Sequence, residues 1–177
     1  MGELSIEYIK SLFDADFLHG NLIWNHRPRD HFQSDQGFKM WNTNYAGKQA
    51  GGLDAKGYRR VKIDGNLVKL HRLIWALAYG HWPRNFIDHI NGNPSDNRLA
   101  NLREATLQEN AFNQKRQVNN TSGVKGVYFR KDREKWVSRI TVDGKLKTLG
   151  FFLSKEEASQ AYCAAAAEIY GEFARTK

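Results

Sequence analysis

IDHINGNPSDNRLANLR occupies residues 87–103 of the chain, and TLQEN follows at residues 106–110. An apolar strand would deliver Asp88 and His89 into a loop of Asn, Gly, Pro and Ser, which are residues that favour turns. A short second strand is expected at residues 102–105. The first and fourth residues of TLQEN, Thr and Glu, have the spacing of a capping box, which starts a helix. These residues therefore predict the order strand, loop, strand, helix.

The same stretch carries side chains suited to phosphodiester hydrolysis. That reaction needs a base to activate water and a cation to stabilise the developing charge and the leaving oxygen. His89 is neutral enough near neutral pH to accept a proton. Asp88 and the side-chain oxygen of Asn110 are hard ligands of the kind that Mg²⁺ or Mn²⁺ prefers. The residues thus predict a hydrolytic centre with one divalent cation.

Asp88, His89, Asn101 and Asn110 resemble the signature of HNH nucleases, in the variant that ends in asparagine, as in phage and intron-encoded homing endonucleases. The resemblance covers most of residues 20–115. It implies a β-β-α metal finger in which His89 is the general base. It also implies that Asp88 and Asn110 hold one cation and that Asn101 orients the loop.

Composition restricts the class of protein and its partner. A chain of 177 residues with 41% hydrophobic content can bury one medium core or two small ones. The 27 Lys and Arg against 19 Asp and Glu give a net charge of +8, which favours a polyanion. No run of roughly 20 apolar residues and no signal pattern is present, so we expect a cytoplasmic protein without a membrane partner. The expected partner is double-stranded DNA, without a small-molecule cofactor, and one cysteine excludes a disulfide or a cysteine-rich zinc site.

The positive charge is concentrated in two blocks. Residues 37–75 carry 8 basic and 2 acidic side chains, and residues 121–153 carry 8 and 3. In the first block, residues 58–63 and 67–70 read as two strands joined by Asp-Gly, a pair that favours a hairpin turn. We expect Arg60 and Lys62 to form a DNA-binding face on this hairpin.

Other segments before residue 80 have weaker patterns. Residues 3–13 have helical spacing, residues 22–24 are strand-like and residues 73–79 form an apolar helix closed by a glycine. Asp14, His19, Gly20 and Asn21 are turn-forming residues that precede the strand-like segment. Residues 33–56 hold four glycines with little periodicity, which predicts a loop.

A polar segment over residues 114–122 predicts a domain boundary. The nuclease domain would span residues 1–117 and a second domain residues 118–177. The second domain contains three strand candidates and a final helix that begins with a capping box at Ser154 and Glu157. The strand candidates are residues 124–130, 136–142 and 146–152.

Residues 122–174 resemble the APETALA2-type DNA-binding domain, on motifs such as SGVKGVY at residues 122–128. The resemblance implies a three-stranded antiparallel sheet that lies in the major groove and is backed by one helix. The groove-facing residues would be Lys125, Tyr128, Arg130, Arg139, Thr141 and Thr148.

The sequence therefore predicts an α+β protein with a β-β-α metal-finger nuclease domain, followed by a three-stranded antiparallel sheet packed on one helix. Its predicted function is divalent-metal-dependent hydrolysis of DNA, with a phage homing role implied by resemblance alone. One alternative is a sequence-specific DNA-binding regulator with a decayed nuclease centre, and another is a structure-specific or RNA-directed nuclease. The oligomeric state is open, as is the choice between nicking and double-strand cleavage.

Overall fold

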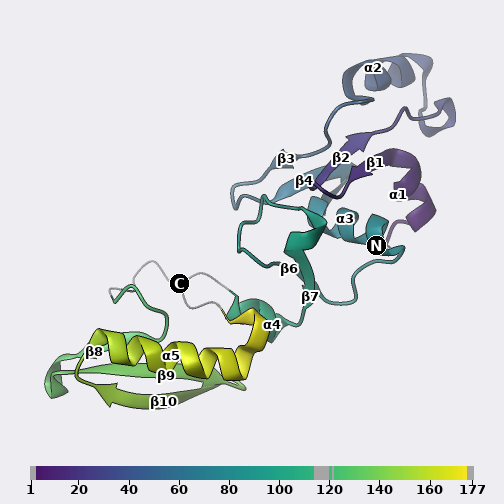
Figure 1. Ribbon diagram of the computed structural model, residues 1–177. Coiled ribbons are helices and arrows are strands. Elements are labelled where there is room, and N and C mark those ends of the chain that lie inside the picture. The colour runs from purple at the N-terminus through teal and green to yellow at the C-terminus, as the bar shows by residue number, and fades with distance from the viewer. Residues whose placement is uncertain (1–2, 114–119, 121, 175–177) are drawn as a thin grey trace. The chain divides into compact units, whose positions relative to one another are not determined.

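The computed structural model describes residues 3–113, 120 and 122–174 of the chain (Figure 1). The chain divides into two compact units, Met1–Ala105 and Thr106–Lys177, and each is described by itself. Small sheets and helices alternate in both, so the predicted mixed α+β class is confirmed. The predicted domain boundary at residues 117 and 118 lies outside the described residues.

The first unit begins with a helix and a hairpin. Helix α1, Ile6–Leu12, starts at Ser5, whose hydroxyl accepts a hydrogen bond from the amide of Tyr8. Strands β1, Phe13–Asp16, and β2, Asn21–Trp24, then pair antiparallel. The expected helix and strand are present, and the expected turn is present at residues 17–20. Asp14 and Asn21 lie in the paired strands instead, because Asp14 pairs with Ile23 and Asn21 with Asp16.

The predicted loop over residues 33–56 is also wrong, because it contains helix α2, Asp35–Tyr45, and strand β3, Gly52–Leu53. Ser34 caps α2 by accepting a hydrogen bond from the amide of Gly37 at 3.1 Å. No residue of α2 is buried, and its apolar residues Phe38, Trp41 and Tyr45 stand among polar residues and Gly37, so the sequence signal for a helix is weak.

A three-stranded antiparallel sheet with the order β3-β4-β5 follows. Strands β4, Arg59–Ile63, and β5, Asn66–Lys69, are joined by Asp64 and Gly65, both at positive φ, as the Asp-Gly pair predicts. Helix α3, Leu70–Tyr79, starts three residues before the prediction, directly at the end of β5, because the fully buried Leu70 already belongs to its apolar face.

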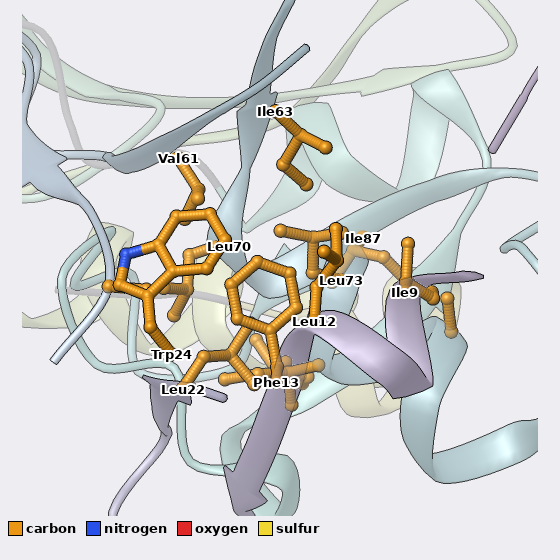
Figure 2. Packing of buried hydrophobic residues seen from close by; sticks show 14 residues of the cluster. Ile9, Leu12, Phe13, Leu22, Trp24, Val61, Ile63, Leu70, Leu73 and Ile87 are labelled. Carbon is orange, nitrogen blue, oxygen red and sulfur yellow. The ribbon is translucent and has the colours of Figure 1, made fainter. Parts of the chain in front are cut away.

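Strands β6, Phe86–His89, and β7, Leu102–Ala105, form an antiparallel hairpin that carries Asp88 and His89. Ile87, which is labelled in Figure 2, fixes this hairpin to the core of the first unit. Leu102 belongs to the same core. The buried residues of this core come from α1, α3 and the strands around them. They are Ile9, Leu12, Phe13, Leu22, Trp24, Ala50, Val61, Ile63, Leu70, Leu73, Ile74, Ala76, Ile87 and Leu102.

The second unit starts with helix α4, Leu107–Phe112, which has the predicted capping box between Thr106 and Glu109. The ring of Phe112 stacks on Tyr170 with centroids 3.7 Å apart, which groups α4 with the second unit. The predicted β-β-α arrangement of β6, β7 and α4 therefore spans the two units and stays a prediction.

The rest of the second unit is an antiparallel sheet with the order β10-β9-β8 and one long helix. The elements are β8, Val127–Arg130, β9, Lys135–Val142, β10, Lys145–Phe152, and α5, Lys155–Tyr170. Helix α5 begins with the predicted capping box and packs small residues such as Ala158 and Ala166 against the sheet. Short 3-10 turns complete the described elements: Arg29–His31, Leu99–Asn101, Lys131–Arg133 and Gly171–Phe173.

Among the described residues, none of the helices combines the length and apolar character needed to cross a bilayer.

Candidate active site

The β6–β7 hairpin presents Asp88 and His89 side by side at the end of β6. Cross-strand register pairs Asp88 with Arg103 and His89 with Leu102. Both Asp88 and His89 are only 5% exposed. Buried polar side chains require partners, so the contacts of these two residues define the site.

Asp88 is paired with an arginine whose side chain is largely buried. The Nε and Nη2 atoms of Arg103 each lie 3.0 Å from Oδ2 of Asp88. This guanidinium compensates the charge of a carboxylate that would otherwise be costly to bury. The sequence interpretation did not single out Arg103, although the predicted hairpin places it directly opposite Asp88.

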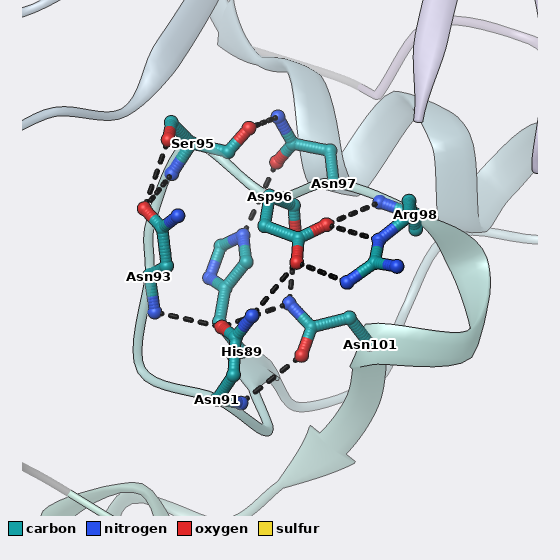
Figure 3. Close-up of polar contacts among 8 residues, drawn as sticks. All are labelled: His89, Asn91, Asn93, Ser95, Asp96, Asn97, Arg98 and Asn101. Atoms are coloured by element: carbon teal, nitrogen blue, oxygen red, sulfur yellow. Dashed lines mark hydrogen bonds and ion pairs between the residues drawn. The ribbon is translucent and has the colours of Figure 1, made fainter. Parts of the chain in front are cut away.

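His89 is held by an asparagine from the loop between the two strands (Figure 3). Its Nε2 lies 3.1 Å from Oδ1 of Asn97, and Asn97 is only 2% exposed. The amide nitrogen of Asn97 donates to the carbonyl oxygen of Ser95 at 3.1 Å. Asn97 was not predicted as a site residue, because in sequence it is one of several turn-forming residues.

Aromatic rings enclose His89 on another side. The ring of His71, from α3, meets it edge-on with centroids 4.9 Å apart, and the ring of Tyr58 lies at 6.0 Å. Burial, with a smaller contribution from His89, lowers the pKa of His71 to about 3, so His71 is neutral. Burial also lowers the pKa of His89, which keeps it in the form that can accept a proton.

Asn101 joins the two ends of the loop (Figure 3). Its amide nitrogen donates to Oδ1 of Asn91 at 3.1 Å and to the carbonyl oxygen of Asp96 at 2.8 Å. Its side-chain oxygen accepts a hydrogen bond from the backbone amide of Asn91 at 3.0 Å. Hydrogen bonds from Arg98 lower the pKa of Asp96 to about 2, which keeps this loop carboxylate ionised.

The turn between β1 and β2 packs against the loop between β6 and β7. The amide of Leu99 donates to the carbonyl oxygen of Phe17 at 3.0 Å. Gly20 has a φ of +71°, and a Cβ at this position would lie 2.3 Å from the backbone of Asn97 and Arg98. Only glycine fits here, so a segment far from the site in sequence determines the position of Asn97.

The predicted metal ligands lie in different units. Asp88 ends β6, whereas Asn110 is on α4, so their joint use stays a prediction. The described residues contain no group of three or more His, Cys, Asp or Glu side chains that could hold a metal ion. A Mg²⁺-type ion nevertheless fits a carboxylate and an amide oxygen, because it commonly uses one or two carboxylates, substrate phosphates and several waters. Arg103 already compensates the charge of Asp88, so a bound ion would share this carboxylate with the guanidinium.

The predicted DNA-binding residues of the first unit lie on β4. Lys62 is exposed, and Arg60 forms an ion pair with Asp54 at 2.6 Å. Arg60 and Lys62 are two residues apart on one strand, so they share a face of the sheet.

In the second unit, strand register brings most of the predicted DNA-binding residues to one face. Tyr128 is opposite Val137, Arg139 is opposite Thr148, and the guanidinium of Arg139 lies 5.3 Å from the centre of the Tyr128 ring. Alternation along the strands adds two more predicted residues to this face. The face contains Tyr128, Arg130, Arg139, Thr141 and Thr148.

Lys125 differs from this set. It precedes β8, and its ammonium donates to the carbonyl oxygen of Phe112 at 2.8 Å. Its side chain therefore contacts the end of helix α4, and Lys125 is not part of strand β8.

Comparison with known proteins gives a match to a nuclease family and several similar proteins. A sequence model described as HNH endonuclease matches residues 68–112, which include Asp88, His89, Asn101 and Asn110. Protein 3.8 of Escherichia phage T7 is 39% identical over 106 residues, which are 59% of this chain and 87% of that protein.

Two further proteins are similar. "Uncharacterized HNH endonuclease L560" of Acanthamoeba polyphaga mimivirus is 33% identical over 124 residues, 69% of this chain, and the match spans 63% of that protein. A solved structure described as "DNA binding and cleavage by the HNH homing endonuclease I-HmuI" has a TM-score of 0.43 and 19% identity, and covers 96% of this chain and 91% of its own.

Proposed function

We propose that the chain is an HNH endonuclease that hydrolyses phosphodiester bonds of double-stranded DNA with the help of one divalent cation, because residues 68–112 match the HNH endonuclease model. The observation that carries this proposal is the buried pair Asp88 and His89 at the end of β6. Asp88 offers a hard oxygen ligand beside Arg103, and His89 is neutral and hydrogen-bonded to Asn97. A ligand and a base on adjacent residues are what metal-assisted hydrolysis of a phosphodiester requires.

Each site residue has a separate role in this proposal. His89 accepts a proton from the attacking water, and Asp88 with Asn110 holds the cation. Asn101 keeps the loop in shape through its hydrogen bonds to Asn91 and to the carbonyl oxygen of Asp96. When bound, Mg²⁺ or Mn²⁺ would stabilise the charge that develops on the phosphate and on the leaving oxygen.

DNA affinity and site choice would come from the two basic surfaces. One is the β4 strand with Arg60 and Lys62. The other is the face of the second sheet that carries Tyr128, Arg130, Arg139, Thr141 and Thr148, together with Lys125 before it. A three-stranded sheet with exposed basic and polar side chains is able to lie in the major groove and contact base edges. With this surface, the second unit would act as an APETALA2-like DNA-binding domain. We expect the protein to act in the cytoplasm of the host cell of a phage, as a homing endonuclease.

Incubation of the pure protein with supercoiled plasmid tests the proposal. Addition of Mg²⁺ or Mn²⁺ should convert the plasmid to nicked or linear DNA, and excess EDTA should abolish the conversion, because the cation stabilises the developing charge. A matched incubation with Asp88→Ala controls for a contaminating nuclease. Full activity in EDTA after verified removal of metal would contradict the one-cation mechanism, and binding of DNA without any cleavage would favour the regulator with a decayed centre.

A further inference from the structure

The loop between β6 and β7 contains a buried amide whose orientation is fixed from both ends. The amide nitrogen of Asn97 donates to the carbonyl oxygen of Ser95, and a carbonyl oxygen only accepts hydrogen bonds. The other end of the amide, Oδ1, therefore faces Nε2 of His89 at 3.1 Å.

This orientation determines where the proton of His89 resides. An amide oxygen is an acceptor only, so the ring nitrogen facing it must be the donor. A neutral histidine carries one ring proton, and with that proton on Nε2 the remaining lone pair is on Nδ1. We propose that Asn97 is a positioning residue that holds His89 as the Nε2–H tautomer and so makes Nδ1 the atom that accepts the proton in catalysis.

The position of Asn97 is itself determined by more than its own loop. The close approach of Gly20 leaves no room for the backbone of Asn97 to move toward the β1–β2 turn, and the amide of Leu99 is tied to Phe17 at 3.0 Å. His71 packs edge-on against the ring of His89, which limits rotation of that ring. A partner that fixes the tautomer of a histidine is effective only when it is held in place, as Asn97 is here.

The inference rests on the proposed role of His89 as the general base, so its test has one readout that does not depend on activity. Long-range ¹H–¹⁵N spectra of the ¹⁵N-histidine-labelled full chain report which ring nitrogen carries the proton, with His89 assigned by loss of its signals in His89→Gln. At about pH 8, where an ordinary histidine is neutral, the wild type should show a protonated Nε2 and an unprotonated Nδ1 for His89. A proton on Nδ1 would overturn the proposal whether or not the variants of Asn97 fold.

Two variants of Asn97 show whether its side chain orients His89 through a hydrogen bond or only fills space in the loop. Asn97→Leu has a similar shape but no acceptor, and should lose the single tautomer and lower the rate of plasmid cleavage about 10- to 100-fold, as expected for removal of a partner of a functional histidine. Asn97→Asp retains an acceptor oxygen and should keep the Nε2–H tautomer. Asn44→Ala removes an exposed amide from helix α2 and should leave both readouts unchanged.

The outcomes distinguish a failure of the role proposed for Asn97 from a failure of the proposed nuclease function. If Asn97→Leu remains folded with an unchanged His89 spectrum and an unchanged rate, Asn97 does not position the base. If the wild type shows the Nε2–H tautomer but cleaves no DNA with any divalent cation, the proposed nuclease function fails while the tautomer assignment stands.

Discussion

At the scale of single residues, the site is formed from polar groups that are buried together with their partners. Asp88 lies against Arg103, and His89 lies against Asn97. A buried carboxylate or imidazole is destabilising unless charge or hydrogen bonds compensate it. These pairs therefore explain how a hydrophobic hairpin tolerates catalytic side chains at its end.

His71 is the exception, because its Nδ1 is buried without a hydrogen-bond partner among the described residues. Burial lowers its pKa to about 3 in the folded protein, whereas an unfolded chain would have the ordinary value of 6.5. The neutral form therefore stabilises the fold fully above pH 6.5, and this stability is lost as the pH falls from 6.5 toward 3.

We predict that this residue makes the protein acid-sensitive. Between pH 7 and pH 5, proton uptake by unfolded His71 should lower the free energy of unfolding by about 2 kcal/mol. His71→Phe should lack this part of the decrease, which urea unfolding of both proteins at several pH values would measure. If the free energy of unfolding depends on pH in the same way in both proteins, His71 takes up its proton in the folded state as well, and the prediction is wrong.

At the scale of elements, the β1–β2 turn packs against the catalytic loop. Substitutions of two glycines test whether this packing stabilises the protein. Gly20→Ala should destabilise the protein by about 1–2 kcal/mol from its positive φ and about 1–3 kcal/mol more from displacement of the Asn97 backbone. Gly47 also has a positive φ, of +73°, but a Cβ there would meet nothing within 4 Å. Gly47→Ala is therefore the matched control, and should show the first contribution only.

Urea unfolding midpoints compare the two variants directly. Equal destabilisation by Gly20→Ala and Gly47→Ala would contradict the close packing of the turn on the loop. A larger effect at Gly20, accompanied by slower DNA cleavage, is the expected result.

Elements with a strong local signal could be predicted from the sequence. The Asp-Gly turn at residues 64 and 65 and the capping box at Ser154 are present as expected, because neighbouring residues alone determine them. Helix α2 was missed because its contacts are tertiary: the guanidinium of Arg27 lies 5.2 Å from the ring of Trp41, and none of the helix is buried.

The same distinction applies to the site. Asp88 and His89 have a recognisable spacing from Asn101 and Asn110, and were predicted together. Asn97 was not, because its role depends on a hydrogen bond that forms only when the loop folds back onto β6.

At the scale of the whole molecule, the division of the chain predicts a division of labour. Residues 106–177 should fold alone, and should be more stable than residues 118–177, because only the longer fragment keeps the stacking of Phe112 on Tyr170. An aromatic pair of this kind contributes about 0.5–1.5 kcal/mol beyond burial, which corresponds to a melting temperature higher by about 2–12 °C. Thermal unfolding followed by circular dichroism measures the difference.

The longer fragment should also bind duplex DNA without cutting it. Binding should weaken steeply with added salt, because contacts of Lys and Arg with phosphates release counterions. A bandshift titration at two salt concentrations measures this. A folded fragment that fails to bind duplex DNA at low salt would assign recognition to the β4–β5 hairpin instead.

If His89 is the base of a hydrolytic centre, its removal should slow the chemical step, which the single-turnover rate of plasmid cleavage by His89→Ala measures. With Mg²⁺ present, we predict a rate about 10² to 10⁴ times lower than that of the wild type. DNA affinity, measured by bandshift without metal, should be nearly unchanged, because His89 is buried and contributes little surface to binding. Cleavage by His89→Ala at the wild-type rate would contradict the account.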